Sequence, residues 1–146
     1  MYQVVLDTNV SVAAMRSRHG ASHCLLNLLG DGRWRPNVTV AVVLEYEAVL
    51  KRDCQQFGLT EEDIDDVVDA LCSQAGLHRL YFLWRPVASD PDDDLILEAA
   101  TASHSDFIIT FNTRHFPDSL KFGIRCLTPR ELLILLRIRH EEYPTP

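Results

Sequence analysis

The alternation that decides the fold begins at residues 2–7, which read Tyr-Gln-Val-Val-Leu-Asp. This short run of aromatic, β-branched and aliphatic residues is typical of a buried β-strand, because such side chains pack well on a pleated sheet. A polar turn with Arg16, Arg18 and His19 follows. The stretch therefore predicts a first strand that ends directly in the carboxylate of Asp7.

Beyond this strand, helical patterns and short apolar runs follow one another along the chain. Apolar residues at helical spacing predict helices over residues 22–29, 41–56, 60–75 and 94–103 and from Pro129 onward, and short apolar runs predict strands over residues 38–40, 80–84, 107–110 and 124–127. Thr60 and Asp63 have the spacing of a capping box, and Gly76 is interpreted as the end of that helix. Such alternation predicts an α/β domain with a mainly parallel central β-sheet flanked by helices on both faces.

The length and composition fit one folded domain. A chain of 146 residues is long enough to bury a core without metal or disulfide support, and 47% hydrophobic with 24% charged residues excludes a disordered or fibrous chain. We find no repeat or linker, so we expect a single domain over residues 1–140 and a short tail over residues 141–146.

Cysteine usage and the start of the chain indicate the compartment. The four cysteines include no C-x-x-C pair, and Cys24 and Cys72 lie in apolar periodic stretches, where a free cysteine is a packing residue. The start lacks a signal peptide, and no uncharged run approaches the length needed to span a bilayer. We therefore expect a cytoplasmic protein with no membrane partner.

The net charge of −7 comes from an uneven distribution of acids. Six acids lie within residues 61–69, where they occupy the polar side of a predicted amphipathic helix and are interpreted as a solvated face. Four more lie within residues 90–94. This balance argues against a protein dedicated to coating nucleic acid, whose phosphate contacts need a basic face, but not against a nuclease whose acids bind cations.

Several polar residues are expected to meet at one edge of the sheet. Asp7 and Asn112 each follow a predicted strand, residues 90–94 lie between a strand and a helix, and Glu45 lies early in a helix. Ligands bind at the carboxyl ends of strands in open parallel sheets. Carboxylates that gather there without His or Cys are ligands of the kind that Mg²⁺ or Mn²⁺ prefers.

Each of these acids also has a purely structural interpretation. Asp7 can cap a turn, residues 92–94 can complement a helix dipole, and Glu45 can be one solvated residue of a helix surface. One or two acids satisfy a helix N-terminus, however, and further like charges repel unless a cation compensates them. The number of acids therefore favours a cation site.

Four segments together resemble the PIN-domain nucleases, in particular the VapC-like toxins of toxin–antitoxin pairs. They are residues 5–10 (VLDTNV), 44–52 (LEYEAVLKR), 90–100 (DPDDDLILEAA) and 106–112 (DFIITFN), in the order and at the strand and helix junctions that the family has. The pattern departs from the family at Asn112, where the family most often has a fourth Asp. The resemblance implies a single PIN-like domain.

It also implies a metal-dependent ribonuclease that uses Mg²⁺ or Mn²⁺ to hydrolyse RNA phosphodiester bonds. By position, the catalytic residues are Asp7, Glu45 and Asp93; the metal ligands are these three with Asn112 and Asp94; and the supporting polar residues are Asn9 and Thr110. The candidates for contacting RNA are Arg16, Arg18, His19, Arg114 and His115. A cognate antitoxin protein and a homodimer are the further partners that the resemblance implies.

Two other functions remain open at this point. An inactive PIN-like module that binds RNA or protein fits the replacement of an acid by Asn112. A phosphatase with Asp7 as its nucleophile ranks last, because that chemistry usually needs a second Asp two residues later and position 9 is Asn.

Overall fold

The structure is a computed structural model that describes residues 1–79, 91–116 and 122–137, with the backbone alone for residues 91–93 and 115. The predicted strand over residues 80–84 and the predicted tail over residues 141–146 lie outside the described residues. Within the described part of the chain, no helix is long and apolar enough to cross a membrane.

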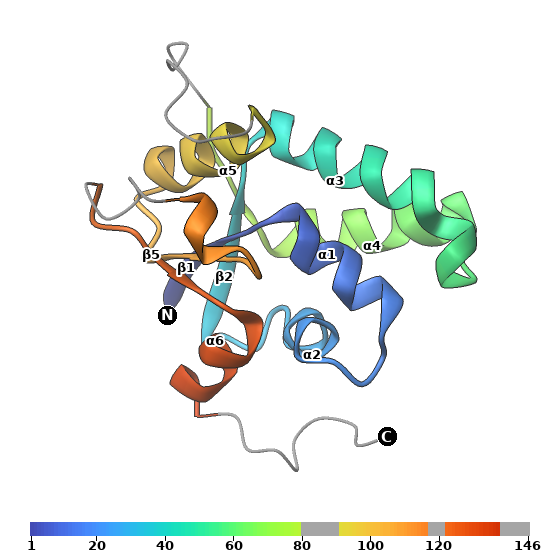
Figure 1. Cartoon of the computed structure of the whole chain (residues 1–146), viewed down its shortest axis with the longest axis horizontal. Coiled ribbons are helices and arrows are strands. Elements are labelled where there is room, and N and C mark those ends of the chain that lie inside the picture. The colour runs from blue at the N-terminus through green and yellow to red at the C-terminus, as the bar shows by residue number, and fades with distance from the viewer. Residues whose placement is uncertain (80–90, 117–121, 138–146) are drawn as a thin grey trace.

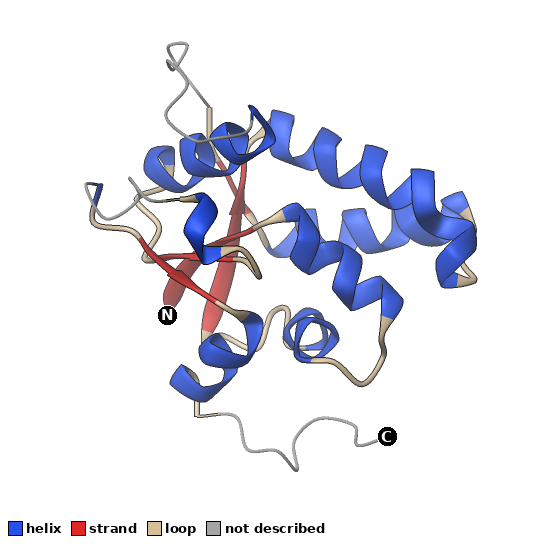
Figure 2. Cartoon of the chain, viewed as in Figure 1, coloured by secondary structure: helices blue, strands red, loops and turns tan. Residues whose placement is uncertain are grey.

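The centre of the molecule is a five-stranded sheet whose pairings are all parallel (Figure 2). Its strands lie in the order β3-β2-β1-β4-β5. The bounds are β1 (Tyr2–Leu6), β2 (Trp34–Val38), β3 (Gly76–Leu77), β4 (Phe107–Ile109) and β5 (Arg125–Leu127). β1 is therefore the central strand, with β2 on one side and β4 on the other.

Helices connect these strands and cover the sheet, which confirms the predicted α/β class. In Figure 1, α1, α3 and α4 extend to the right of the strands, and α5 lies over them at the upper left. α5 packs on β1, β2 and β4, while α4 packs on β2 and on α3. The helices are α1 (Thr8–Arg16), α2 (Ala21–Asn27), α3 (Val40–Asp53), α4 (Glu61–Gln74), α5 (Pro91–Ala102) and α6 (Pro129–Leu135), with short 3₁₀ helices η1 (Cys54–Phe57) and η2 (Thr113–His115).

The core forms around β1. Val4 and Val5 are fully buried, and they belong to one apolar cluster with Ile108 of β4 and Leu132 of α6. A strand buried on both faces reads as a continuous apolar run, which is why residues 4–6 carry no polar side chain. This packing holds the end of β1 rigidly in the middle of the sheet.

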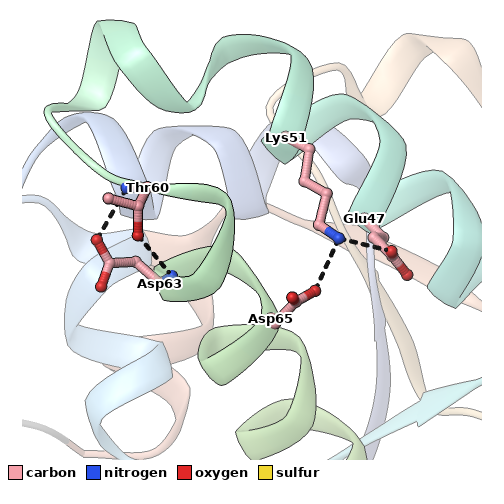
Figure 3. A network of polar contacts seen from close by, with 5 residues as sticks. All are labelled: Glu47, Lys51, Thr60, Asp63 and Asp65. Atoms are coloured by element: carbon pink, nitrogen blue, oxygen red, sulfur yellow. Dashed lines mark hydrogen bonds and ion pairs between the residues drawn. The ribbon is translucent and has the colours of Figure 1, made fainter.

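Two helices begin with the capping boxes that their sequences favour. At α4, the Thr60 hydroxyl accepts the Asp63 N–H at 3.1 Å, and the Asp63 carboxylate accepts the Thr60 N–H at 2.9 Å (Figure 3). Thr128 and Glu131 do the same at α6. The predicted start at Thr60 is confirmed, and the two bonds satisfy N–H groups that have no partner within the helix.

A lysine ties α3 to α4. Lys51 lies 2.8 Å from the Asp65 carboxylate and 3.0 Å from that of Glu47, one turn earlier on α3 (Figure 3). Asp65, and then Glu47, raise the pKa of the Lys51 amine. The six acids of residues 61–69 are exposed, as predicted. One of them, Asp65, joins α4 to α3 through Lys51.

The sequence prediction is wrong at several elements. α1 replaces the simple polar turn expected after Asp7, because Asp7 itself caps a helix whose β-branched residues lower its helix propensity. β2 starts at Trp34 rather than at residue 38, and it contains Pro36, which weakens any strand pattern. Gly76 directly follows the C-cap of α4, as predicted, but it also begins β3, a strand that the sequence analysis did not expect.

The cysteines follow their predicted role in part. All four are free thiols, and Cys24 is buried in the core as expected. Cys72, in contrast, is exposed on α4. Partial loss of solvent around its sulfur raises the pKa of the Cys72 thiol, and nearby Asp69 raises it further, so the thiol is further from its reactive thiolate form than an ordinary cysteine.

Candidate active site at the carboxyl end of the sheet

Asp7 lies where the direction of the chain through the sheet reverses. From β1 the chain goes to β2 and β3 on one side, and later returns to β4 on the other side. Ligand sites of open α/β sheets lie at such switch points, outside the carboxyl ends of the strands. The Asp7 N–H donates to the Ile109 carbonyl of β4 at 2.8 Å, so the pairing of the two strands continues to the site.

The Asp7 side chain is held by two donors. Its Oδ1 accepts the Thr8 N–H at 2.8 Å, which makes Asp7 the N-cap of α1, and its Oδ2 accepts the Thr110 hydroxyl at 2.7 Å. The residue is 7% exposed. Burying a carboxylate is unfavourable unless it is hydrogen-bonded, so these contacts offset part of the cost of burial and fix the orientation of the side chain.

Thr110 connects Asp7 to the loop after β4. Its Oγ1, which donates to Asp7, accepts the Asn112 N–H at 3.0 Å and lies 3.5 Å from the Asn9 amide nitrogen. The Asn9 amide oxygen accepts the Phe111 N–H at 3.5 Å. Asn9 and Thr110, the predicted supporting residues, thus link the start of α1 to the end of β4.

Tyr46 supports the same strand end from α3. Its buried hydroxyl donates to the Leu6 carbonyl, one residue before Asp7. Burial, and then the Asp7 charge, raise the pKa of the Tyr46 phenol well above its usual range. Tyr46 therefore remains a neutral donor at physiological pH.

An open pocket lies in front of Asp7, between α1 and α3. Glu45 lines it from α3, one residue before Tyr46, and Asn9 and Arg16 line it from α1. Asp7 and Glu45, two of the three acids predicted to be catalytic from the family resemblance, therefore line one pocket. No histidine or cysteine is among its described lining residues.

Sequence reasoning missed the other charged and aromatic residues among the described lining of this pocket, which are Arg52, Asp53 and Phe111. Arg52 lies 3.2 Å from the Asp53 carboxylate, and Asp53 first and Glu45 more weakly raise the pKa of its guanidinium. Arg52 follows Glu45 by seven residues, which is two helical turns, so the helical period could have placed both on one face.

The remaining predicted metal ligands either lie away from the described lining of the pocket or have side chains outside the described residues. Asp94, half-buried on α5, and Asn112, exposed after β4, are not among the described residues that line the pocket. Asp93 belongs to α5, but its side chain lies outside the described residues. Among the side chains that are described, no three of His, Cys, Asp or Glu come close enough to hold a metal ion.

The predicted RNA contacts are likewise divided. Arg16 lines the pocket. Arg18 and His19 are exposed in the turn after α1, and Arg114 is exposed in η2, but none of these three is among the described lining residues. The His115 side chain lies outside the described residues.

Comparison with known proteins agrees with this geometry. Residues 3–114 match the model of a family described as the PIN domain, and this range contains most of β1, all of β2 to β4 and every described residue that lines the pocket. A search among curated proteins found none that matches the chain. PIN domains are generally nucleases, so the comparison points to a nucleic-acid substrate. Because the match extends over more than half of the chain, the protein belongs to the PIN domain family.

Proposed function

We propose that this protein is a metal-dependent endoribonuclease that uses Mg²⁺ or Mn²⁺ and acts as the toxin of a toxin–antitoxin pair. The observation that carries the proposal is the position of Asp7 and Glu45, which line one open pocket at the switch point of the sheet. Two carboxylates at the edge of a nuclease fold are suited to binding a cation beside a phosphodiester.

The donor set of the pocket fits a hard cation. Asp7, Glu45 and Asn9 offer oxygen ligands, and the described lining contains no soft or imidazole ligand. Mg²⁺ and Mn²⁺ prefer such oxygens. We assign the third carboxylate of the site to Asp93, which belongs to the first half of α5. The proposal also keeps Asp94 and Asn112 as further metal ligands. When bound, the cation would lower the pKa of a coordinated water and stabilise negative charge on the phosphate.

The chain's own residues prepare the site before substrate binds. The Thr8 N–H and the Thr110 hydroxyl hold the Asp7 carboxylate in one orientation, so little reorganisation is needed during the reaction. Arg16 and Arg52 line the same pocket, where their positive charges attract the phosphate backbone. The negative net charge of the whole chain is then compatible with binding RNA.

RNA cleavage is tested with purified protein and single-stranded RNA, with and without Mg²⁺ or Mn²⁺. We expect metal-dependent cleavage that falls by at least about a hundredfold in Asp7→Asn and in Glu45→Gln, since both remove a charged ligand. Asp66→Asn, an exposed acid of α4 outside the pocket, is the matched control and should cleave at the wild-type rate. Cleavage in EDTA, or full activity of Asp7→Asn, would contradict the proposal.

The toxin role rests on the resemblance of the four sequence segments to VapC-like proteins. We expect production of the protein alone in the bacterial cytoplasm to arrest growth, and a co-produced antitoxin to relieve the arrest. Normal growth in the presence of active enzyme would contradict the toxin role but not the nuclease. The sizes of the free protein and of its complex would reveal the proposed homodimer.

An inactive binding module is the second candidate, and one observation favours it: the family's fourth acid is replaced by Asn112, which is exposed. Calorimetric titration with Mn²⁺ separates the two. Binding by the wild type that disappears in Asp93→Asn supports the enzyme, and absence of binding supports the module.

A further inference from the structure

Phe111 is an exposed aromatic residue beside the catalytic acids. It follows Thr110 directly and lines the pocket with Asp7 and Glu45, and it is 50% exposed. None of the other described residues that line this pocket is aromatic. The core does not require a large apolar ring at this position, because half of its surface remains in water.

The backbone of Phe111 is held by the same contacts that hold the site. Its N–H donates to the Asn9 amide oxygen at 3.5 Å. The residues on either side are joined by the bond from the Asn112 N–H to the Thr110 hydroxyl, at 3.0 Å. The backbone of Phe111 is therefore held beside Asp7, so little backbone entropy is lost when a ligand packs on the ring.

We propose that Phe111 stacks on one nucleobase of the substrate, next to the phosphate bound in the acidic pocket. This inference rests on the proposed ribonuclease function. Aromatic side chains beside a backbone-binding site are the usual means of holding single strands, because every base has a π-face for stacking. A base inside a duplex is already stacked and paired, so it reaches the ring only at a cost.

The charges of the pocket agree with this assignment. Arg16 from α1 and Arg52 from α3 line the pocket together with Phe111. Backbone contacts position a nucleic acid, whereas contacts to bases select it. The two arginines are therefore assigned to the phosphates and Phe111 to the base.

Stacking is measured with single-stranded oligoribonucleotides that carry 2-aminopurine at successive positions, mixed with the full chain in EDTA. We expect the fluorescence to be quenched at one position by the wild type and by Phe111→Tyr, which keeps an aromatic ring. Phe111→Ala should abolish that quenching. Phe122→Ala is the matched control, because Phe122 is 44% exposed but lines a different pocket.

Kinetics with Mg²⁺ give an independent measurement. Phe111→Ala should raise KM for single-stranded RNA about tenfold with a smaller change in kcat, consistent with the measured contribution of base–aromatic stacking. An abasic site at the quenched position should raise the KM of the wild-type protein by the same factor. The same substrate should leave the KM of Phe111→Ala almost unchanged. A thermal unfolding midpoint equal to that of the wild type would show that the variant is folded.

The outcomes separate this inference from the proposed function. Binding and quenching without cleavage would support stacking and reject the nuclease. Cleavage with wild-type KM in Phe111→Ala, or equal quenching by that variant, would reject stacking and leave the nuclease intact. Wild-type cleavage of duplex RNA as fast as single-stranded RNA would also reject the inference, as would a Phe111→Ala defect confined to binding of a protein partner.

Discussion

The Thr110 hydroxyl donates a 2.7 Å hydrogen bond to Oδ2 of Asp7, across 103 residues of sequence. The two residues follow the adjacent parallel strands β4 and β1, so the pairing of those strands places them together. Thr110 is fully buried, and its oxygen also accepts the Asn112 N–H. Position 110 therefore supports the carboxylate without lining the described pocket.

Replacing Thr110 with Val keeps the shape and removes the donor. We expect Thr110→Val to lower the free energy of unfolding by about 1–3 kcal/mol, because a buried acceptor loses its partner. Loss of a group that orients a metal ligand should also reduce cleavage roughly 10–100-fold. Urea unfolding and initial cleavage rates measure the two effects. Thr110→Ser, which retains the hydroxyl, should restore most of both, and equal losses in Ser and Val would contradict this account.

Tyr46→Phe removes the hydroxyl that donates to the Leu6 carbonyl. We expect the free energy of unfolding to fall by about 1–2 kcal/mol, since this carbonyl is buried beneath the site. Tyr2→Phe is the matched control: Tyr2 is 37% exposed at the surface, so the change should be within about 0.5 kcal/mol. Urea denaturation at pH 7 gives both values, and similar stabilities would show that the Tyr46 bond contributes little.

Arg16 and Arg18 provide a matched pair of basic residues. Arg16 lines the pocket, whereas Arg18, two residues later, is exposed but is not among the described lining residues. Arg16→Ala should raise KM for RNA about tenfold and reduce the slope of binding against salt by about one, as expected for one phosphate contact. Arg18→Ala should change KM by less than about twofold and leave the salt slope nearly unchanged. Comparable defects in the two variants would argue for a diffuse electrostatic effect.

Gly76→Ala tests how closely the backbone approaches a buried polar group. A Cβ at Gly76 would lie 2.5 Å from the Asn37 amide oxygen and 3.0 Å from His78 Nε2, where these two groups are hydrogen-bonded. We expect a loss of about 2 kcal/mol in thermal or urea unfolding, because Asn37 is buried and must move. Gly20→Ala, whose Cβ would meet only Ser17 at ordinary distances, should cost less than about 1 kcal/mol.

His78 makes stability depend on pH. Burial, then Arg35 and His104, lower the pKa of its imidazole below the ordinary 6.5, and its Nε2 contacts the Asn37 amide oxygen. The unfolded chain then binds the proton more readily than the folded one, so this contribution to stability is complete above pH 6.5 and is lost as the pH falls below it.

The test compares thermal unfolding midpoints between pH 7.5 and pH 5. The midpoint of His78→Gln should fall less over this range than that of the wild type, because the variant has no imidazole to protonate at this position. His19→Gln, a change at an exposed histidine, should retain the wild-type slope. A steeper fall in His78→Gln than in the wild type would reverse the sign of this assignment.

Much of the fold could be read from local patterns. The apolar run before Asp7, the capping box of Thr60 and Asp63 and the apolar run over residues 107–109 are local features, and each gives the predicted element. α1 and the true start of β2 were missed because tertiary packing overrides weak local signals, as at Pro36, which is buried in a strand.

The candidate site was predictable in its chemistry but only partly in its composition. Asp7 could be identified because it directly follows a strand, and Glu45 because it lies early in a helix and matches the glutamate segment of the family. The helical period could place Arg52 on the same face as Glu45, but nothing local marks it or Phe111 as a site residue, because a surface arginine and an aromatic residue after a strand are common in any domain. Only their position in the pocket distinguishes them.

The sequence by itself determined the α/β alternation, the acidic residue after the first strand and the family pattern, because all three depend on side-chain type and local spacing. Only the tertiary structure decided that Thr110 holds Asp7, that Tyr46 supports Leu6 and that Phe111 lines the same pocket as Glu45. The physical reason is that the order β3-β2-β1-β4-β5 brings together segments about a hundred residues apart. Contacts between such segments depend on strand order and packing, which no local pattern specifies.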